Sequence, residues 1–146
     1  MKYALEIDID LPREKVIELF DNTDNMFKWM EGLVGFEHLS GESGQEGAQS
    51  RLKYKMGKRE IEMIETITKR NLPDEFTGTY EAKGVWNEVA NRFVEVSPEK
   101  TKWITDQEFR FTGFMKVIGF LMPGSFKKQS YKYLELFKKF AEKEAG

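Results

Sequence analysis

The segment that opens the chain, "KYALEIDID" (2–10), alternates apolar and polar residues. Its apolar side chains share one side: Tyr3, Leu5, Ile7 and Ile9. A period of two predicts a β-strand with one buried face. The spacing then becomes helical, and Pro12 stands where the first turn of a helix accepts a proline. We therefore predict a strand followed by two short helices, over 12–21 and 25–30.

The central part of the chain keeps the period of two and is interrupted by turn-forming segments such as "SGESGQEG", "NLPD" and "SPEK". The pattern predicts six further strands, over 33–41, 48–56, 59–70, 75–83, 85–96 and 101–111. Because the connections are short, neighbouring strands must be antiparallel. One side of the strands is apolar and the other charged, which predicts one covered face and one solvated face. Trp103 falls on the covered side, and Trp86 on the solvated side.

The C-terminal segment 125–144 has helical spacing of apolar residues. They are Phe126, Tyr133, Leu134, Phe137 and Ala141. We predict an α+β fold of one domain, residues 1–146, which is an ordinary length for a single core. In this fold one long C-terminal helix lies across the concave face of a curved, seven-stranded antiparallel sheet.

An apolar run, "FMKVIGFLM" (114–122), precedes Pro123-Gly124. It is too short to span a membrane, which takes about 20 apolar residues. Lys116 is its only basic residue, whereas membrane-surface helices usually have a lysine-rich face. The apolar residues lie around most of a helix, so we expect cover from the sheet on one side and from an apolar ligand on another. Proline and glycine predict a joint, and the run would then be a movable wall over a cavity.

Four phrases of the sequence resemble those of the START-like (SRPBCC) superfamily: "IDLPREKVIELFDNTDNMFKWMEGL", "REIEMIETIT", "GTYEAKGVWN" and "FMKVIGFLMPGSFKKQSYKYLELFKKFAE". The resemblance covers essentially the whole chain. The superfamily includes polyketide cyclases and dehydrases, proteins of the birch-pollen-allergen type and lipid-transfer domains. The central and C-terminal phrases resemble one bacterial subfamily whose physiological role is not established. The resemblance implies the helix-grip fold, with an apolar cavity between the sheet and the long helix.

The composition excludes several classes of function. Net charge is −2, so no global field would attract nucleic acid or an anionic membrane. The absence of cysteine excludes disulfides, a thiol nucleophile and thiolate metal sites. The N-terminus has acidic residues where a signal peptide has an apolar core, and we expect a cytoplasmic protein. We expect no metal, no cofactor, no nucleic acid and no membrane insertion, and a monomer or weak dimer.

Two residues are weak catalytic candidates. His38 is the only histidine, and alternation places it with Val34 and Phe36, toward the expected cavity. Nothing near it in the sequence would orient it as a base. Glu65 shares a side with apolar residues, where a carboxylate must pair, become neutral or meet water. It is either an acid in the cavity or, as we favour, part of a salt bridge at the rim.

We predict binding of a hydrophobic or amphipathic small molecule, such as a lipid, fatty acid, isoprenoid or polyketide-like compound. The amides at Asn87, Asn91 and Gln107 would contact its polar end or bond within the protein. A cyclase or dehydrase that uses His38 or Glu65 is the first alternative, and a protein-interaction module is the second. The candidate ligand-binding residues are Phe36, His38, Tyr54, Met63, Tyr80, Asn87, Val89, Asn91, Trp103, Gln107, Phe109, Phe114, Ile118, Met122 and Phe126.

Overall fold

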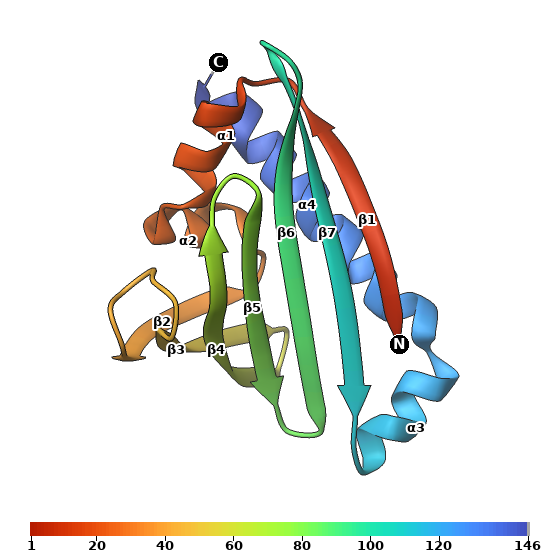
Figure 1. The fold of residues 1–146 in the computed structure, drawn as a ribbon. Helices are drawn as coiled ribbons and strands as arrows, with labels where there is room; N and C mark the ends of the chain where they lie inside the picture. The colour runs from red at the N-terminus through yellow and green to blue at the C-terminus, as the bar shows by residue number, and fades with distance from the viewer. Residues whose placement is uncertain (146) are drawn as a thin grey trace.

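A seven-stranded antiparallel sheet with the strand order β1-β7-β6-β5-β4-β3-β2 forms the framework of the protein (Figure 1). The computed structural model describes residues 1–145. The strands are β1 (Lys2–Ile9), β2 (Leu33–Ser40), β3 (Gln49–Met56), β4 (Arg59–Asn71), β5 (Glu75–Ala82), β6 (Val85–Ser97) and β7 (Lys100–Phe111). Every neighbouring pair is antiparallel, as predicted from the short connections.

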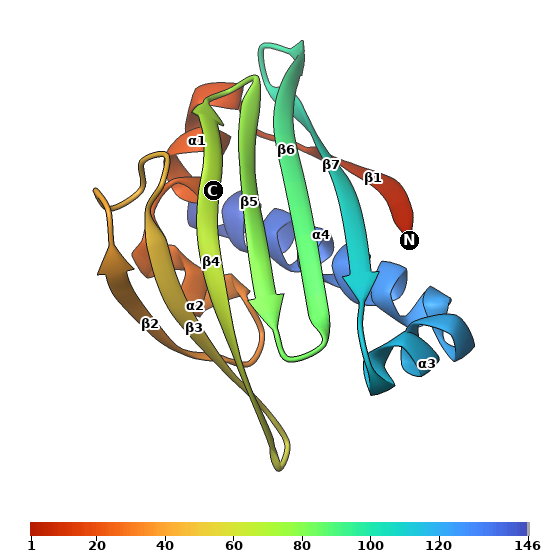
Figure 2. The ribbon, with the colours of Figure 1, turned by 60° about the horizontal axis from the view of Figure 1, so that its bottom comes forward.

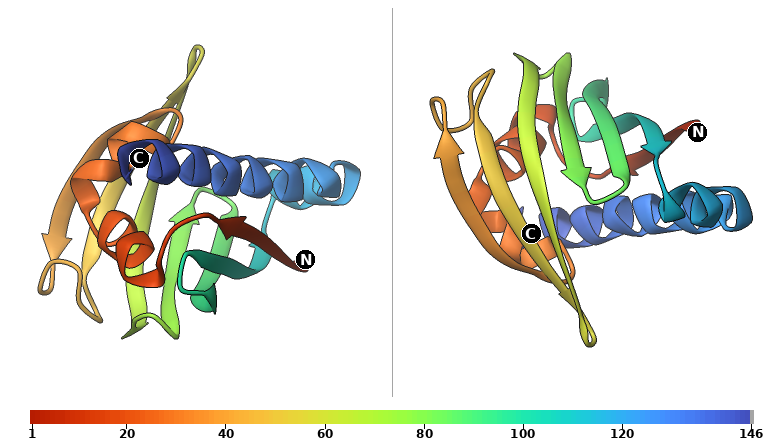
Figure 3. Two further views of the ribbon diagram at one scale, coloured as in Figure 1. Left: turned by 90° about the horizontal axis from the view of Figure 1, so that it is seen from above. Right: turned by 90° about the horizontal axis from the view of Figure 1, so that it is seen from below.

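The helices are α1 (Arg13–Phe20), the 3-10 helix η1 (Thr23–Asn25), α2 (Met26–Trp29), α3 (Phe114–Leu121) and α4 (Pro123–Ala145). With 23 residues, α4 is about 35 Å long. It crosses the concave side of the sheet, where it packs along β1 and against α1 and α2 (Figures 2 and 3). The predicted helix-grip architecture is thus confirmed.

The main core lies between the sheet, α1 and the C-terminal half of α4. Its centre is an aromatic group in which the ring of Phe20 meets Phe93, Trp103 and Phe137 edge-on, with ring centres 5.0 to 5.8 Å apart. Trp103 is only 4% exposed. On the opposite face of the sheet, the half-buried Trp86 lies under the guanidinium of Arg110, 4.5 Å from the ring centre. The predicted assignment of the two tryptophans to opposite faces is correct.

A smaller apolar cluster lies under β2, β3 and β4, centred on Leu33, Leu52 and Tyr54. The strand pairing shifts between Leu33 and Gly35, which marks a β-bulge. Leu33 is therefore 7% exposed and Val34 61% exposed, although alternation predicted Val34 on the covered side. That prediction is wrong because one extra residue in a bulge reverses the alternation on one side of it.

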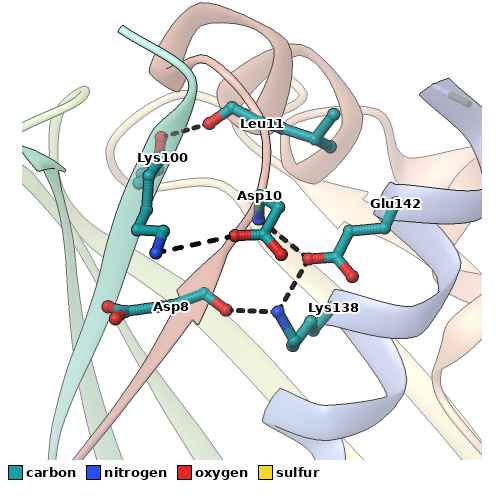
Figure 4. A network of polar contacts seen from close by, with 7 residues as sticks. Asp8, Asp10, Leu11, Lys100, Lys138 and Glu142 are labelled. Atoms are coloured by element: carbon teal, nitrogen blue, oxygen red, sulfur yellow. Dashed lines mark hydrogen bonds and ion pairs between the residues drawn. The ribbon is translucent and has the colours of Figure 1, made fainter. Parts of the chain in front are cut away.

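Polar contacts join the C-terminal part of α4 to the end of β1 (Figure 4). The Lys138 ammonium donates to the Asp8 carbonyl at 2.6 Å and pairs with Glu142 at 2.7 Å. The carboxylate of Glu142 also accepts the Asp10 backbone N–H at 2.8 Å. Partial burial alone would raise the pKa of Glu142, but these two donors more than offset it and hold the pKa below its ordinary value. These contacts fix the position of α4 on the edge strand.

The apolar run 114–122 differs from its predicted role. It forms α3 as a separate helix, but the turn into α4 falls at Met122 (φ −132°, ψ 50°), while Pro123 and Gly124 lie inside α4. The predicted joint at Pro123-Gly124 is therefore wrong, because the residue before a proline is the one displaced from helical geometry. Among residues 1–145, no helix is long and apolar enough to cross a membrane.

Candidate functional site

The concave face of β4, β5 and β6 is only partly covered, because α4 makes its closest approach to the sheet at the edge strand β1. Register places a set of inner side chains here that stay half-buried. We call this set the inner patch: Ile61, Met63, Tyr80, Ala82, Val85, Asn87 and Val89. Apolar side chains that remain partly accessible on a concave face are typical of a surface that takes an apolar ligand.

A buried acid borders the inner patch. Glu65 on β4 stands opposite Tyr80 on β5 and is 8% exposed. Its carboxylate accepts a 2.8 Å hydrogen bond from the Tyr80 hydroxyl. No lysine or arginine among residues 1–145 pairs with it within 4.0 Å, so the favoured prediction of a salt bridge at the rim is wrong. The alternation alone could not decide this, because the partner of Glu65 lies on another strand.

The pKa values of Glu65 and Tyr80 are both raised, so each group holds its proton more tightly than it would in water. Burial raises the pKa of Glu65, and the hydrogen bond from Tyr80 offsets part of the rise. Burial raises the pKa of Tyr80 as well, and the negative charge of Glu65 adds to it. Tyr54 is also buried, and its pKa is raised mainly by that burial. A neutral phenol, Tyr80, therefore bonds a carboxyl that can give or take a proton, which suits the binding of a carbonyl or hydroxyl group and acid–base chemistry.

The predicted amides have partners within the protein. Asn87 donates from Nδ2 to the Glu108 carbonyl at 3.0 Å. Asn91 accepts the indole N–H of Trp103 at 3.0 Å, and the amide oxygen of Gln107 accepts from the Ser130 hydroxyl at 3.2 Å. The intramolecular alternative therefore accounts for all three amides. Asn87 still belongs to the inner patch, whereas Asn91 and Trp103 are buried in the core.

The N-terminal half of α4 covers the far end of the concave face. Phe126 lies 5.2 Å from Phe109 and 5.0 Å from Phe111 between ring centres. Beside them the hydroxyls of Tyr3 and Ser130 are 2.6 Å apart. The predicted residues Phe109 and Phe126 thus come together, and Phe109 stands in the same cross-strand row as Glu65, Tyr80 and Asn87. Ser130 was not among the candidates, although it stands one helical turn from Phe126 and one from Leu134, on their side of the helix.

Thr105 also lay outside the candidates. It is fully buried on the inner side of β7, and its hydroxyl has no hydrogen-bond partner among residues 1–145. The alternation Trp103, Thr105, Gln107 had placed it on that side. Only the structure shows that its hydroxyl is unmatched.

Three candidates are exposed to solvent: His38, Phe114 and Met122. His38 is exposed on the edge strand β2, and its Nε2 lies 2.8 Å from the Gly41 carbonyl oxygen, so the expectation that it faces a cavity is wrong. Alternation placed His38 on the correct side of β2, but the side chain is exposed there because β2 is the edge strand of the sheet. Phe114 and Met122 are also exposed, while Ile118 and Phe36 are half-buried. No group of three or more His, Cys, Asp or Glu side chains within 1–145 could hold a metal ion.

Two hollows lie elsewhere on the surface. One, of about 360 Å³, lies at β1, β6 and β7, and the other, of about 630 Å³, lies along α4 between Ser125 and Glu135. Neither is lined by Glu65 or Tyr80, and both are lined mainly by polar and charged side chains. We therefore place the candidate site at the inner patch, where a buried acid meets accessible apolar surface.

Comparison with solved structures identifies the fold. A conserved protein from Geobacillus kaustophilus superposes with a TM-score of 0.80 at 18% identity, covering 98% of this chain and 96% of that one. The Zhui aromatase/cyclase from Streptomyces sp. R1128 superposes with a TM-score of 0.78 at 13% identity, covering 100% and 96%. Norcoclaurine synthase from Thalictrum flavum gives 0.73 at 9% identity, with coverage of 100% and 96%.

These likenesses define the class of protein by its fold. The chain shares its helix-grip fold with these structures, as predicted from the sequence. No family model matches the chain, and no curated protein matches its sequence. An aromatase/cyclase and norcoclaurine synthase are among the structures with this fold, and because fold does not imply function, a function must be argued from the site itself.

Proposed function

We propose that the protein binds an amphipathic small molecule on the inner patch. The apolar body of the ligand lies on Ile61, Met63 and Val89, and its hydroxyl or carbonyl end meets the pair Glu65–Tyr80. The observation that carries this proposal is the juxtaposition of a buried, hydrogen-bonded carboxyl with partly exposed apolar side chains on a concave face. Burial of the apolar part would supply most of the affinity, at roughly 25 cal/mol per Å² removed from water.

The side chains of the inner patch indicate the class of ligand. A fatty acid, isoprenoid or polyketide-like compound has a long apolar part and one polar end, and the inner patch has this same division. The fold is shared with an aromatase/cyclase, which supports a ligand of the kind that such an enzyme cyclises. The cytoplasmic location and the monomeric or weakly dimeric state stay predictions, and size-exclusion chromatography tests the second.

Native mass spectrometry of the purified protein tests the proposal first, by showing a co-purified apolar compound. Fluorescence titration of two variants with a fatty-acid analogue then locates the binding site. Val89→Asp should weaken binding at least about tenfold, since a charge would replace apolar wall. Val94→Asp, on the same strand but with an exposed side chain, is the matched control and should leave binding unchanged. Equal affinities of these two variants would refute the site.

A second candidate function is acid–base catalysis of the cyclase or dehydrase kind, with Glu65 as the acid or base. The raised pKa of Glu65 and its contact with a neutral phenol favour it, since enzymes shift carboxyl pKa values in this direction for proton transfer. Incubation with a poly-β-ketone thioester tests it. Glu65→Gln should abolish turnover and keep binding within about threefold, because glutamine preserves the shape and an acceptor for Tyr80. Turnover that survives Glu65→Gln excludes this role.

A further inference from the structure

The outward side of α3 is apolar and exposed. Phe114 is 75% exposed and Phe120 83% exposed, and Val117, Leu121 and Met122 are about half to two-thirds exposed. Phe114, Val117, Phe120 and Leu121 have the i, i+3, i+6, i+7 spacing of one helix face. We call this set, with Met122, the α3 apolar face. Contiguous exposed apolar surface of this kind usually marks a surface that something else covers.

The opposite side of α3 is held closely against the sheet, so this orientation is built into the fold. A Cβ at Gly119 would lie 2.6 Å from the ring of Phe111, and a Cβ at Gly84 would lie 2.9 Å from the Met115 side chain. Such close approach fits only glycine at both positions. Phe114 and Phe120 therefore face outward because Met115 and Gly119 face inward. The helix stands beyond the end of the sheet and projects from the molecule (Figures 1 and 2).

Along the chain, the charged residues on both sides of the α3 apolar face are all of one sign. The stretch 109–134 holds five basic residues and no acidic residue, although the whole chain has a net charge of −2. Lys116 is on α3 itself, and Lys127 and Lys128 stand in the first turns of α4, at most about 9 Å along the helix from Met122. These three lysines are exposed and have no ion pair within 4.0 Å among residues 1–145. The sequence pattern had offered only Lys116, whereas the fold adds two more lysines beside the same helix.

We propose that the α3 apolar face docks the protein on the surface of an anionic lipid bilayer. A projecting helix with aromatic and aliphatic side chains on one side and lysines at its flank matches the interfacial layer, where apolar groups enter between the headgroups and cations meet lipid phosphates. The helix lies in the interface and does not span the bilayer.

Two other occupants fit the same surface less well. A second copy would bring two sets of unpaired lysines together, and α3 offers five outward apolar residues where a stable dimer uses about 20 to 30 residues a side. A partner helix needs a groove to receive it, and α3 projects outward. Both occupants are outcomes of the test below.

Co-sedimentation of the full chain with vesicles tests the proposal. We expect binding to vesicles of phosphatidylcholine mixed with phosphatidylglycerol, weaker binding to pure phosphatidylcholine, and a decrease at high salt. Phe114→Ser/Phe120→Ser should lower the partition coefficient at least about tenfold. Lys127→Ala/Lys128→Ala should lower it on the order of 30-fold, since each lysine near an anionic surface contributes roughly fivefold.

Matched variants elsewhere control for composition. Val94→Ser/Val96→Ser removes two exposed apolar residues from β6, and Lys53→Ala/Lys55→Ala removes two exposed lysines from β3. Both controls should bind vesicles like the unmodified protein. All the substituted positions are exposed, so thermal melts should show that each variant folds. The proposal is overturned if the unmodified protein does not bind anionic vesicles, or if the controls lose as much binding as the α3 and α4 variants. It is also overturned if, without lipid, the protein sediments as a dimer that Phe114→Ser/Phe120→Ser dissociates.

Discussion

The Tyr80 hydroxyl donates a 2.8 Å hydrogen bond to the Glu65 carboxylate, and no cation pairs with that carboxylate within residues 1–145. Burial therefore raises the pKa of Glu65 above that of the unfolded chain. In this situation the unfolded state releases its proton first, so stability falls as pH rises from the ordinary carboxyl range through the raised pKa.

Glu65→Gln should remove this loss. The variant is expected to be more stable than the unmodified protein at neutral pH and to converge with it in acid, because glutamine carries no charge to bury. Urea unfolding at several pH values measures the difference. Glu81→Gln, at an exposed position on the neighbouring strand, serves as control and should not change the pH dependence. A constant difference at every pH would mean that the pKa of Glu65 is the same in the folded and unfolded states, which would contradict the rise caused by burial.

Tyr80→Phe should raise the pKa of Glu65 further. The phenol stabilises the charged carboxylate by donating to it, and phenylalanine removes only that donor. The carboxyl carbon shift of Glu65 in an NMR titration reports the change directly. A lower pKa in Tyr80→Phe would show that the hydroxyl does not donate to this carboxylate.

Trp103→Ala should destabilise the protein by about 3–5 kcal/mol, since it empties the centre of the aromatic core. It also removes the indole donor that Asn91 accepts. Trp86→Ala, at the half-buried position under Arg110, should cost clearly less. Thermal melts rank the pair, and the reverse order would contradict the face assignment of both tryptophans.

Glu142→Gln should reduce the acid sensitivity of the protein. The pKa of Glu142 is lowered in the folded state, so its contribution is present above the unfolded pKa and is lost as pH falls through the folded pKa. The unmodified protein should therefore lose stability in that window, and Glu142→Gln should lose less. Chemical unfolding in mildly acidic buffers checks this. Glu144→Gln, an exposed change in the same last turns of α4, should behave like the unmodified protein.

Gly119→Ala and Gly124→Ala form a matched pair. At Gly119 a methyl group would meet the Phe111 ring at 2.6 Å, and we expect a loss of about 1–3 kcal/mol with displacement of α3. At Gly124 nothing lies within 4 Å and φ is not positive, so alanine should be neutral or add about 0.4–1 kcal/mol. Melting temperatures measure both. Because Gly124 lies inside α4, its substitution should not slow ligand exchange in stopped-flow binding, contrary to the prediction of a joint at this residue.

Local pattern accounts for much of what was predicted here. Alternation in "TKWITDQEF" depends only on the two-residue repeat of a strand, so it assigns Trp103 and Gln107 to the inner side whatever the rest of the fold does. Helical spacing likewise assigns Leu134 and Phe137 to the buried side of α4. The candidate site was predicted only in part. Tyr80 and Glu65 were both named, but their hydrogen bond joins residues fifteen positions apart in sequence.

The sequence by itself determined the order of the elements, the antiparallel pairing and the side on which most residues lie, because these follow from backbone periodicity and short connections. The tertiary structure decided what covers each side. In the folded protein Glu65 is buried beside the Tyr80 phenol, and His38 is exposed because β2 is at the edge of the sheet. A β-bulge turns Val34 to the solvated side of the sheet, and the apolar residues of α3 face outward. The physical reason is that the burial of a side chain and the identity of its hydrogen-bond partner depend on which distant segments pack together. A local pattern of apolar and polar residues does not specify those contacts.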